Sequence, residues 1–548
     1  MKSISCENVL LDDTWDAIVV GSGIGGLASA ALLSRYAGKR VLVLERHYVP
    51  GGYTHVFHRP GYEWDVGLHY IGKVQDPDSQ LRRAFDLVTD AQLEWAPMPD
   101  VYDRFVIGDR TYDFVRGLEP FRARLKEYFP KETASIDRYI QALQSVVKVQ
   151  ELYFAEKAIP RLWAFLLGGW MRGPLLRWAR RTTEEVLTDF TNNRELIGLL
   201  TAQWGCYGLP PRQSSFALHA GVAAHYLEGA NYPVGGAGQI AETIAPVIRR
   251  SGGQVVVNAE VGQVLLKGNR ALGVRMTDGR EVRTPIVISD IGARSTFSRL
   301  VPQEETACKN LVSKIMAIPP SGAHVCLYVG VKESAANLGI NGTNIWVYPT
   351  YDQDKNLAAV TEDPAAPFPV VFLSFPSAKD PDFERRHPGR ATIQVIAGLP
   401  YSLFAPWQDT NWQHRGSDYD DLKQSIAGRL QEELLRQVPC LNGKIDHAEL
   451  STPLSTRHFM NYPHGEMYGL SVTPERFKLR CLTPVTPIRG LYLTGQDVAS
   501  AGVGGALTGG FLTASAILRR NLFGDLGKAR PTSQKTNRLV ERQPVLAG

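Results

Sequence analysis

A buried strand, a glycine-rich turn and a helix follow one another near the start of the chain and constrain its fold more than any other feature. Residues 15–20 (WDAIVV) are typical of a short buried strand, and residues 21–26 (GSGIGG) form the turn. The small and apolar residues of 27–36 predict a helix packed on a sheet, and 39–45 (KRVLVLE) predicts a second strand. This β–α–β order indicates a parallel sheet.

The turn has the Gly-x-Gly-x-x-Gly spacing of dinucleotide-binding folds. Gly21 permits the tight turn after the strand, Gly23 lets the backbone approach a pyrophosphate, and Gly26 allows the helix to pack closely on the strand. Ile24 and Gly25 lie at the start of the helix, where unpaired N–H groups and the positive dipole end favour phosphate. We therefore expect all five residues to contact the cofactor.

Residues at the end of the second strand predict which nucleotide is bound. Glu45 lies nineteen residues after Gly26, placed to accept hydrogen bonds from ribose hydroxyls and to repel a 2′-phosphate. Arg46 follows it, and the pair Gly51-Gly52 with Tyr53 lets the chain continue close beside the cofactor toward a flavin. The alternative is a glycine-rich turn with a surface glutamate, which would not require the complete strand–turn–helix–strand context.

A second glycine-rich segment lies near the C-terminus. Residues 491–497 (LYLTGQD) predict a strand that ends in Thr-Gly-x-Asp, and a helix over 504–522 follows it. A helix N-terminus at this point suits the ribityl and phosphate region and can stabilise reduced flavin. Taken alone, the segment could be another β–α turn, but with the N-terminal half it predicts FAD. The expected contacts are Gly495, Asp497, Gly504 and Gly505.

Composition excludes several other classes. The chain has 548 residues, 44% of them hydrophobic, and a net charge of +5 that is dispersed along it, so a nucleic-acid partner is not expected. The six cysteines form no Cys-x-x-Cys pair, which argues against a metal site or a disulfide framework and favours a reducing compartment. No run of eighteen apolar residues and no signal peptide are evident. We expect a cytoplasmic protein.

Further segments resemble the flavoprotein group of phytoene desaturases, carotenoid isomerases and retinol saturases, and the retinol saturase subgroup most closely. They are 51–57 (GGYTHVF), 61–72 (GYEWDVGLHYIG), 216–219 with 232–236, 465–470 and 491–522. That subgroup commonly has small residues or Cys after the Gly pair, where this chain has Tyr53-Thr54. The resemblance implies that Val261 faces the adenine through its backbone. It also implies an FAD enzyme that saturates, desaturates or isomerises a carbon–carbon double bond in a long lipophilic substrate.

The expected fold is α/β, with a Rossmann-like FAD-binding domain of the glutathione-reductase type, an inserted helical cap and a mixed-sheet substrate domain. Strands are also expected at 254–257, 325–329, 370–373 and 392–396, and helices at 238–251 and 419–437. The expected division is 12–77, 227–300 and 481–524 for FAD binding, 78–226 for the cap, 301–480 for the substrate domain and 525–548 for a flexible tail.

Alkene chemistry beside a flavin needs an apolar tunnel with few ionisable groups. The candidates for its wall are Asp65, His69, Tyr70, Tyr232 and Tyr468. His69, Tyr70 and Tyr468 are the expected catalytic residues, with His69 the first choice as proton donor because imidazole changes charge near neutral pH. Asp65 and Tyr232 are expected at the substrate, and Asp65 is expected to support its loop rather than react. Structural roles for His69 and Tyr468 remain the alternative.

Residues 161–181 are rich in Trp and Arg and contain no acid. Trp163, Trp170 and Trp178 alternate with five Arg residues, and Gly168-Gly169 and Gly173-Pro174 are expected to break the stretch into short pieces. This composition predicts an anchor on the cytoplasmic face of an anionic membrane. The alternative is a buried cap helix with a basic solvated face.

Several functions compete on such a fold. The first is an FAD-dependent saturase or desaturase of a retinoid, carotenoid or unsaturated lipid, and the second is a redox-neutral cis/trans isomerase of a polyene. A prenyl-lipid carrier resembling Rab GDP-dissociation inhibitors would not need the intact fingerprint, and an amine oxidase would lack the middle segments. Only one fingerprint is visible, so a separate NAD(P)H domain is not expected, and the electron partner is open among quinone, oxygen, a carrier protein and NAD(P)H.

Overall fold

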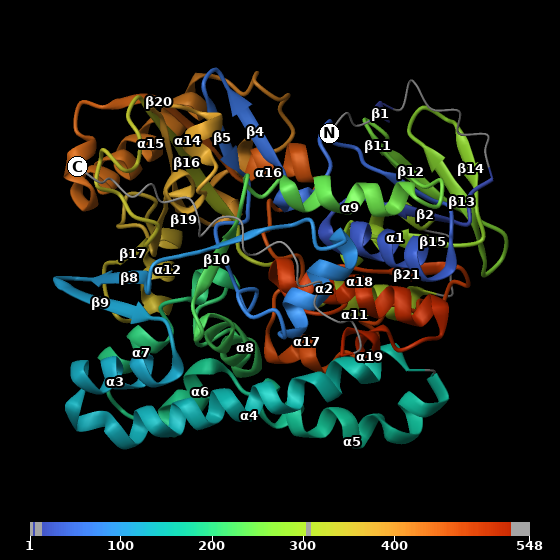
Figure 1. The fold of residues 1–548 in the computed structure, drawn as a ribbon, viewed down its shortest axis with the longest axis horizontal. Helices are drawn as coiled ribbons and strands as arrows, with labels where there is room; N and C mark the ends of the chain where they lie inside the picture. Colours follow the sequence, from blue (N-terminus) through green and yellow to red (C-terminus); the bar gives the residue numbers. More distant parts are fainter. Residues whose placement is uncertain (1–3, 6–13, 160, 303–307, 528–548) are drawn as a thin grey trace, which may run out of the picture.

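The computed structural model describes residues 4–5, 14–159, 161–302 and 308–527 (Figure 1). Most of the tail expected at 525–548 therefore lies outside the described residues. Within them, the strands form a six-stranded sheet, a seven-stranded sheet and three smaller sheets. The two large sheets lie side by side, and a layer of helices runs beneath them in the view of Figure 1.

The six-stranded sheet is parallel throughout, as the β–α–β opening predicts. Its order is β1 (Ile4–Ser5), β11 (Gln254–Val257), β3 (Val41–Leu44), β2 (Ala17–Val20), β15 (Val287–Ser289) and β21 (Leu491–Leu493). Helices α1 (Ile24–Ala37), α9 (Gln239–Arg249) and α18 (Gly502–Leu518) pack on one another beside it. Three separate segments of the chain thus build one dinucleotide-binding body.

Both faces of this sheet are covered, so its central strands are buried along their whole length. Val19 and Val43 belong to the core shared with α1 and α9, whereas Ile18 and Leu42 face the core shared with the antiparallel sheet β12–β13–β14. The strands of that small sheet are β12 (Val261–Leu266), β13 (Ala271–Met276) and β14 (Glu281–Arg283). A turn over residues 277–280 joins the last two.

The seven-stranded sheet is mixed, which confirms the expected second sheet. Its order is β20 (Ile445–Ser451), β16 (His324–Val331), β19 (Ala391–Gly398), β18 (Val371–Ser374), β17 (Asn344–Tyr348), β8 (Val101–Ile107) and β9 (Arg110–Val115). All pairs are antiparallel except β17 with β8. Helix α15 (Ser417–Gln437) packs against it.

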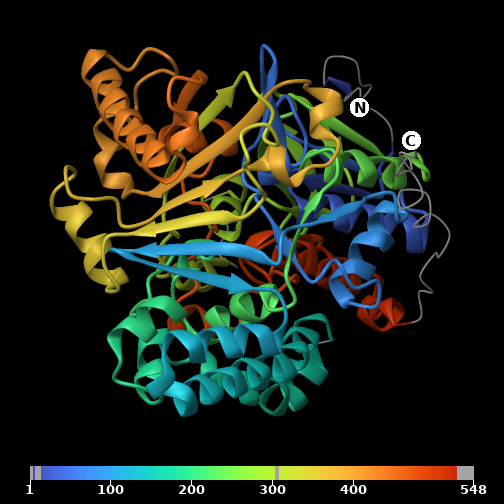
Figure 2. The same ribbon diagram turned by 60° about the vertical axis from the view of Figure 1, so that its left-hand side comes forward.

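Residues 78–226, where a helical cap is expected, also contain the hairpin β8–β9. It lies along β17 in Figure 2, although more than two hundred residues separate the two segments in sequence. The alternating pattern of 101–107 (VYDRFVI) and the turn at Gly108, which has a positive φ, explain the strands. The range also contains β7 (Trp95–Pro97), which pairs with β10 (Ala230–Pro233).

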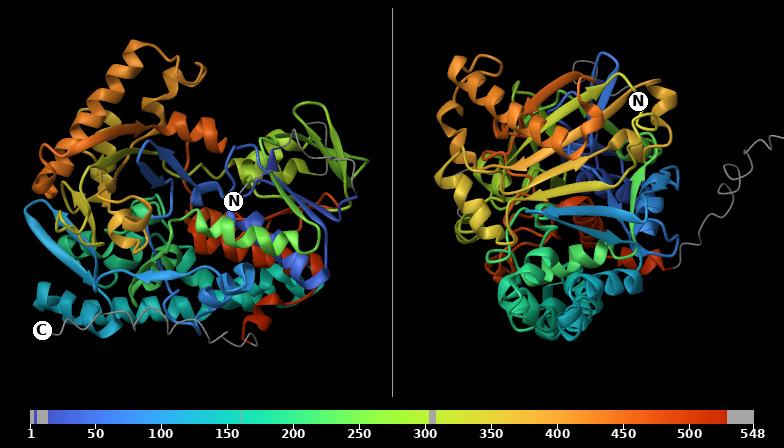
Figure 3. Two further views of the ribbon diagram at one scale, coloured as in Figure 1. Left: turned by 45° about the horizontal axis from the view of Figure 1, so that its top comes forward. Right: turned by 90° about the vertical axis from the view of Figure 1, so that its left-hand side faces the viewer.

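The remainder of that range forms the helical layer, drawn in cyan and green in Figure 1 and at the bottom of the right-hand view in Figure 3. Its helices are α3 (Leu118–Tyr128), α4 (Thr133–Ala158), α5 (Arg161–Ala179), α6 (Thr183–Thr188), α7 (Arg194–Leu200) and α8 (Phe216–Tyr226). The expectation that α5 is broken into pieces is wrong, because it runs through Gly168 and Pro174. Met171, Leu175 and Leu176 are buried, and α5 packs on α4 and α8, which holds the helix together.

The other elements connect these bodies. The strands are β4 (Val56–Arg59), β5 (Tyr62–Asp65) and β6 (Ile71–Gly72). The helices are α2 (Gln80–Thr89), α10 (Ala293–Ser295), α11 (Lys309–Met316), α12 (Gln353–Glu362), α13 (Pro376–Lys379), α14 (Phe383–Arg386), α16 (Pro453–Met460), α17 (Pro474–Lys478) and α19 (Leu522–Leu526). None of the helices in the described part of the chain is long and apolar enough to pass through a bilayer.

Candidate cofactor and substrate cavity

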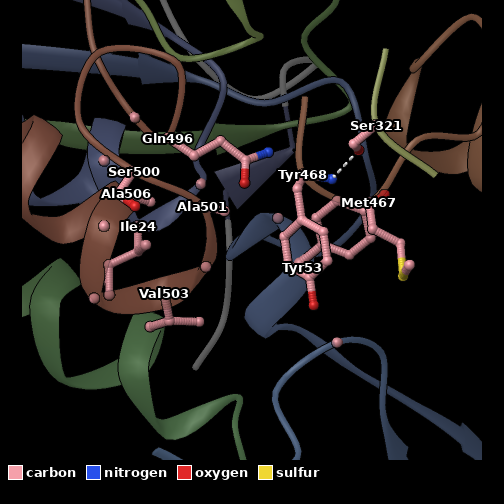
Figure 4. Close-up of a pocket in the computed structure, with 18 of the residues that line it drawn as sticks. Ile24, Tyr53, Ser321, Met467, Tyr468, Gln496, Ser500, Ala501, Val503 and Ala506 are labelled. Atoms are coloured by element: carbon pink, nitrogen blue, oxygen red, sulfur yellow. Dashed lines mark hydrogen bonds between the residues drawn. The ribbon is translucent and has the colours of Figure 1, made fainter. Parts of the chain in front are cut away.

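A cavity of about 1260 Å³ lies where the two large sheets and the helical layer meet. Its wall is mainly apolar and draws residues from all three bodies. One end contains the predicted fingerprint around Gly23, and another part is lined by Phe154, Leu175 and Trp204 from the helical layer. Figure 4 shows Ile24, Val503 and Ala506 on one side of the pocket and Tyr53, Met467 and Tyr468 on the other.

The N-terminus of α1 fits a pyrophosphate group. Gly23 is its N-cap residue, the N-cap position offers no side-chain hydrogen bond, and the first turn holds no acidic residue. Gly21 has a φ of 95°, which favours glycine. A Cβ on Gly25 would lie 2.6 Å from the Cα of Gly495, so the first and last segments of the fold meet only because both residues are glycine.

A second helix begins at the same cavity. Helix α18 also lacks a side-chain cap and an acidic first turn, and Gly504 and Gly505 line the cavity. A Cβ on Gly505 would lie 2.1 Å from the Ser500 carbonyl oxygen, so the loop before the helix requires glycine there. Two positive helix ends beside one elongated cavity match the donor set that FAD needs.

The residues expected at the adenosine end are brought together around Ser22. Glu45 Oε2 accepts hydrogen bonds from the Ser22 backbone N–H (2.9 Å) and hydroxyl (2.7 Å), and Glu45 Oε1 accepts one from His47 N–H (2.7 Å). The Ser22 hydroxyl oxygen in turn accepts a hydrogen bond from Gly51 N–H. Glu45, Gly51 and Val261, the first residue of β12, all line the cavity.

Two further expected cofactor residues have structural contacts as well. Arg46 lines the cavity but donates to the His458 carbonyl at 2.5 Å and lies 3.4 Å from Glu260, so its guanidinium joins α16 to the start of β12. Asp497 Oδ2 accepts a hydrogen bond from Ala293 N–H and Oδ1 accepts one from Leu470 N–H. Asp497 therefore fixes the loop that forms the cavity wall.

The segment around Gly52 continues toward the centre of the cavity. Gly52 has a φ of 55°, and a Cβ on it would lie 3.0 Å from the Cα of Gly23. Tyr53 follows, donates its hydroxyl to the Glu466 carbonyl at 2.9 Å and stacks on Tyr462. In Figure 4 the rings of Tyr53 and Tyr468 lie next to each other.

Asp290 is a cavity residue that sequence reasoning missed. It follows β15 directly and lines the cavity. A Cβ added to Gly23 would lie 2.5 Å from Asp290 Oδ2, and one added to Gly25 would lie 2.7 Å from Oδ1. Burial, aided by Glu45 and Asp497, raises the pKa of Asp290 to about 8. Its carboxyl group is therefore mainly protonated at neutral pH and does not repel a phosphate at the α1 terminus.

The three expected catalytic residues all line the cavity. His69 Nδ1 is buried without a hydrogen-bond partner, and burial, aided by Lys379 and His324, lowers the pKa of His69 to about 3. Tyr468 is held by its N–H to the Ser321 hydroxyl (2.8 Å) and by its own hydroxyl to the Gly205 carbonyl (3.2 Å). An uncharged His69 is a poor proton donor.

The next residue, Tyr70, has an acidic partner behind the cavity wall. The Tyr70 hydroxyl donates to Asp103 Oδ2 at 3.0 Å and lies 3.4 Å from the Cys206 sulfur. Its ring stacks on Tyr226 with centroids 4.4 Å apart, which fixes its orientation. Tyr70 and Cys206 line the cavity and Asp103 is fully buried.

Asp65 and Tyr232, expected at the substrate, hydrogen-bond to each other instead. Asp65 Oδ2 accepts the Tyr232 hydroxyl and Oδ1 accepts the Ala237 N–H at 2.8 Å. Both side chains are buried, and neither belongs to the cavity lining among the described residues. Their contacts join β5 to β10, in line with the supporting role expected for Asp65.

The three tryptophans expected at a membrane divide into two groups. Trp163 and Trp170 are 54% and 71% exposed, together with Phe165, Leu166 and Leu167. Trp178 instead packs on Phe216, so its expected place on the same surface is corrected. We call the exposed group of five residues the α5 patch. Arg172 pairs with Glu156 at 3.1 Å, so it does not belong to that surface.

The missed residues differ in the signal they leave in the sequence. Asp290 follows directly after β15, a parallel strand that lies beside β2. Such folds bind ligands at the carboxyl ends of their parallel strands, so the position that identified Glu45 also identifies Asp290. Asp103 shares the buried side of an alternating strand with Phe105 and Ile107, which is a weaker signal. Lys379 ends a short helix and gives no local signal at all.

The fold and the cavity define an FAD-binding oxidoreductase with a lipophilic chamber. Residues 19–87 match the family described as NAD(P)-binding Rossmann-like domain. The all-trans-retinol 13,14-reductase of Danio rerio is 35% identical over 92% of this chain and 86% of that protein. The chain therefore belongs to the retinol saturase and phytoene desaturase family.

Two further similarities are more distant. Prolycopene isomerase 1 of an Oncidium hybrid cultivar is 26% identical over 88% of this chain and 80% of that protein. The solved structure of a cyclohexylamine oxidase from Brevibacterium oxydans is 16% identical, has a TM-score of 0.57 and matches 94% of this chain and 99% of that one. At this identity the second likeness concerns the fold alone.

Proposed function

We propose that the protein reduces a carbon–carbon double bond in a conjugated, lipophilic alkene of the retinoid or carotenoid class, with FAD as its cofactor. The observation that carries the proposal is one mainly apolar cavity that is lined by two uncapped helix N-termini and by Tyr70. The name of the Danio rerio relative, a retinol reductase, supports the reaction type.

The residues proposed to hold FAD come from three segments of the chain. Gly21, Gly23, Ile24, Gly25 and Gly26 would face the pyrophosphate; Glu45, Arg46 and Val261 the adenosine; and Gly51, Gly52, Tyr53, Gly495, Asp497, Gly504 and Gly505 the flavin half. When bound, FAD supplies hydride chemistry to the alkene.

The chain itself orients the substrate, excludes water and handles one proton. Tyr70 is the proposed proton donor to the carbon that does not receive hydride, because Tyr70 lines the cavity and its hydroxyl is held by Asp103. Neutral His69 and Tyr468 would shape the chamber around the reacting carbons. The reverse reaction would use the same groups in the opposite order.

Anaerobic incubation with all-trans-retinol, a carotenoid precursor and an unsaturated fatty acid tests the proposal, with products identified by mass. The reduced enzyme should add two hydrogens to one of these compounds, and the oxidised enzyme should leave that compound unsaturated. Recovery of every compound unchanged from both forms would contradict the proposal. A matched incubation of Tyr70→Phe should yield far less product.

The prolycopene isomerase relative favours one second candidate, a redox-neutral cis/trans isomerisation. Reversible protonation by Tyr70 would lower the order of a double bond without net electron transfer. This reaction gives a product of unchanged mass and altered retention, so the same incubation separates the two candidates. NAD(P)H or a quinone is proposed as electron partner only for the reductase.

The α5 patch supports a further part of the proposal, peripheral attachment to an anionic membrane. Its exposed Trp, Phe and Leu side chains would enter the interface, and the exposed Arg177 and Arg180 lie on the same helix or directly after it. Helix α4, which packs against α5, contributes Val147 and Phe154 to the cavity wall. A lipophilic substrate could then reach the cavity from the lipid phase.

A further inference from the structure

A buried chain of polar side chains connects the cavity to a cation deep in the seven-stranded sheet. Asp103 lies on β8, Asn344 on β17 and Lys379 at the end of α13, and all three are buried. None of them belongs to the cavity lining among the described residues. Hydrogen bonds connect them to the cavity wall through the Tyr70 hydroxyl and the His69 carbonyl.

The hydrogen bonds among these buried side chains fit a cation at Lys379 and a carboxylate at Asp103. Lys379 Nζ donates to the His69 carbonyl (3.0 Å), the Asn344 amide oxygen (2.5 Å) and the Ser374 hydroxyl (2.8 Å), which uses the three donors of an ammonium group. Asn344 Nδ2 donates to Asp103 Oδ1 at 2.9 Å. The amide therefore bridges the cation and a carboxylate.

Asp103 is surrounded by donors on its other oxygen. Oδ2 accepts the Tyr70 hydroxyl at 3.0 Å and Gln203 Nε2 at 2.9 Å. Burial raises the pKa of Asp103, and the hydrogen bonds from Asn344 and Gln203 lower it. Burial lowers the pKa of Lys379 to about 7, and Asp103 and Asp65 act in the opposite direction.

We propose that Asp103 is the proton store of the reaction, that Tyr70 relays its proton, and that Lys379 stabilises the carboxylate through Asn344. During saturation the protonated carboxyl of Asp103 gives its proton to the Tyr70 oxygen while the Tyr70 O–H proton passes to one substrate carbon. FAD, when bound, would supply the hydride chemistry for the other carbon. One O–H bond re-forms on Tyr70, one C–H bond forms, and Asp103 becomes a carboxylate. Solvent water returns the proton.

The distance of 3.0 Å between the Tyr70 hydroxyl and Asp103 Oδ2 allows a proton to pass between them. The titratable groups that face Asp103 are Tyr70, Tyr102, Tyr226, Tyr348, Cys206 and Lys379. Burial raises the pKa of each of these tyrosines and of Cys206, so they are neutral over the physiological range. Lys379 is thus the charged group that can set the protonation of Asp103. This inference rests on the proposed reduction.

The test is a single-turnover reaction of the reduced, FAD-loaded enzyme with substrate, measured over a range of pH in H2O and D2O. The wild-type rate should fall as pH rises, because Asp103 loses its proton, and should show a solvent isotope effect. Asp103→Asn should lower the rate about 100-fold and remove the fall with pH, with substrate KM unchanged. Lys379→Met removes a counter-charge, so the fall should move upward by about one pH unit.

Two further variants keep the result interpretable. Asp103→Asn leaves a buried ammonium without its anion and can lower stability, so the double variant Asp103→Asn/Lys379→Met removes both charges and should react as slowly as Asp103→Asn. Asp380→Asn is the matched control, because this buried carboxylate pairs with Arg386 at 2.6 Å and has no contact with Tyr70. It should keep the wild-type pH profile.

A rate for Asp103→Asn within twofold of wild type, or an unmoved pH profile for Lys379→Met, overturns the inference. In either case the proposed reduction stands, because the wild-type enzyme still forms the reduced product. Absence of product from the wild-type enzyme would instead contradict the proposed function itself.

Discussion

Replacing Asp290 by Asn should make FAD binding independent of pH in the mildly alkaline range. Asp290 lies against the glycines at the start of α1, where the pyrophosphate is proposed to bind. One of its carboxyl oxygens is buried without a hydrogen-bond partner. Ionised Asp290 would therefore repel the phosphate charges, whereas the protonated form and Asn would not.

The size of the expected effect follows from the raised pKa of Asp290. Burial raises the pKa of Asp290 from 3.8 to about 8. At roughly 1.4 kcal/mol per unit this is about 6 kcal/mol of ionisation cost. Protonated Asp290 makes its full contribution to the stability of the folded apoprotein when the pH is below 3.8, the pKa of this group in the unfolded chain. This contribution to the free energy of unfolding is lost as pH rises toward about 8. Above that pH, each further unit should weaken FAD binding about tenfold, because one proton must be taken up on binding.

The assay is titration of FAD with apoprotein, followed by quenching of flavin fluorescence from neutral pH to well above the pKa of Asp290. Wild-type affinity should fall at alkaline pH, and Asp290→Asn should bind with a constant affinity over the same range. Lys157 and Lys379 titrate in both proteins, so the difference between the two curves isolates Asp290. Parallel curves would refute the reasoning.

Three other substitutions test separate parts of the account. Tyr70→Phe should lower turnover by about 10²- to 10⁴-fold while FAD stays bound, measured by product formation and flavin absorbance; unchanged turnover would remove Tyr70 from the reaction. Trp163→Ala with Trp170→Ala should reduce co-sedimentation with anionic vesicles, whereas Tyr48→Ala, an exposed aromatic outside the α5 patch, should not; equal binding by all three proteins would dismiss the membrane proposal. Gly509→Ala should lower the free energy of unfolding by about 1–3 kcal/mol or more, because its Cβ would lie 2.3 Å from the Gly495 carbonyl oxygen. Gly428→Ala, where a Cβ meets no neighbouring atom, should be neutral or slightly stabilising in the same denaturant titration.

The dinucleotide-binding body was predictable because its signals are local. The strand at residues 17–20, the glycine turn and the helix are adjacent in sequence, and parallel pairing follows from the helix between the strands. The hairpin β8–β9 was not predictable in the same way. Its strands are completed by β17, and the aromatic and basic residues around them carry no sign of that distant partner. The continuity of α5 through Pro174 likewise depends on α4 and α8.

The site divides along the same line. Glycines at helix starts and a glutamate at a strand end predict a cofactor, because dinucleotide binding requires those residues at fixed spacings in the sequence. His69 was expected to exchange a proton because a free imidazole does so near neutral pH, but its burial depends on residues far away in the chain. Lys379 meets His69 and Asn344 only in the folded molecule. Protonation states that depend on burial among distant residues are therefore the part of the site that the sequence does not predict.

The proposed reduction is tested most directly by counting electrons. Photoreduced enzyme is mixed anaerobically with all-trans-retinol, and the return of oxidised flavin absorbance is compared with the amount of dihydro product. One molecule of reduced product is expected for each flavin reoxidised. Flavin that stays reduced while retinol is recovered intact, under conditions where oxygen reoxidises the same flavin, would contradict the proposed reduction.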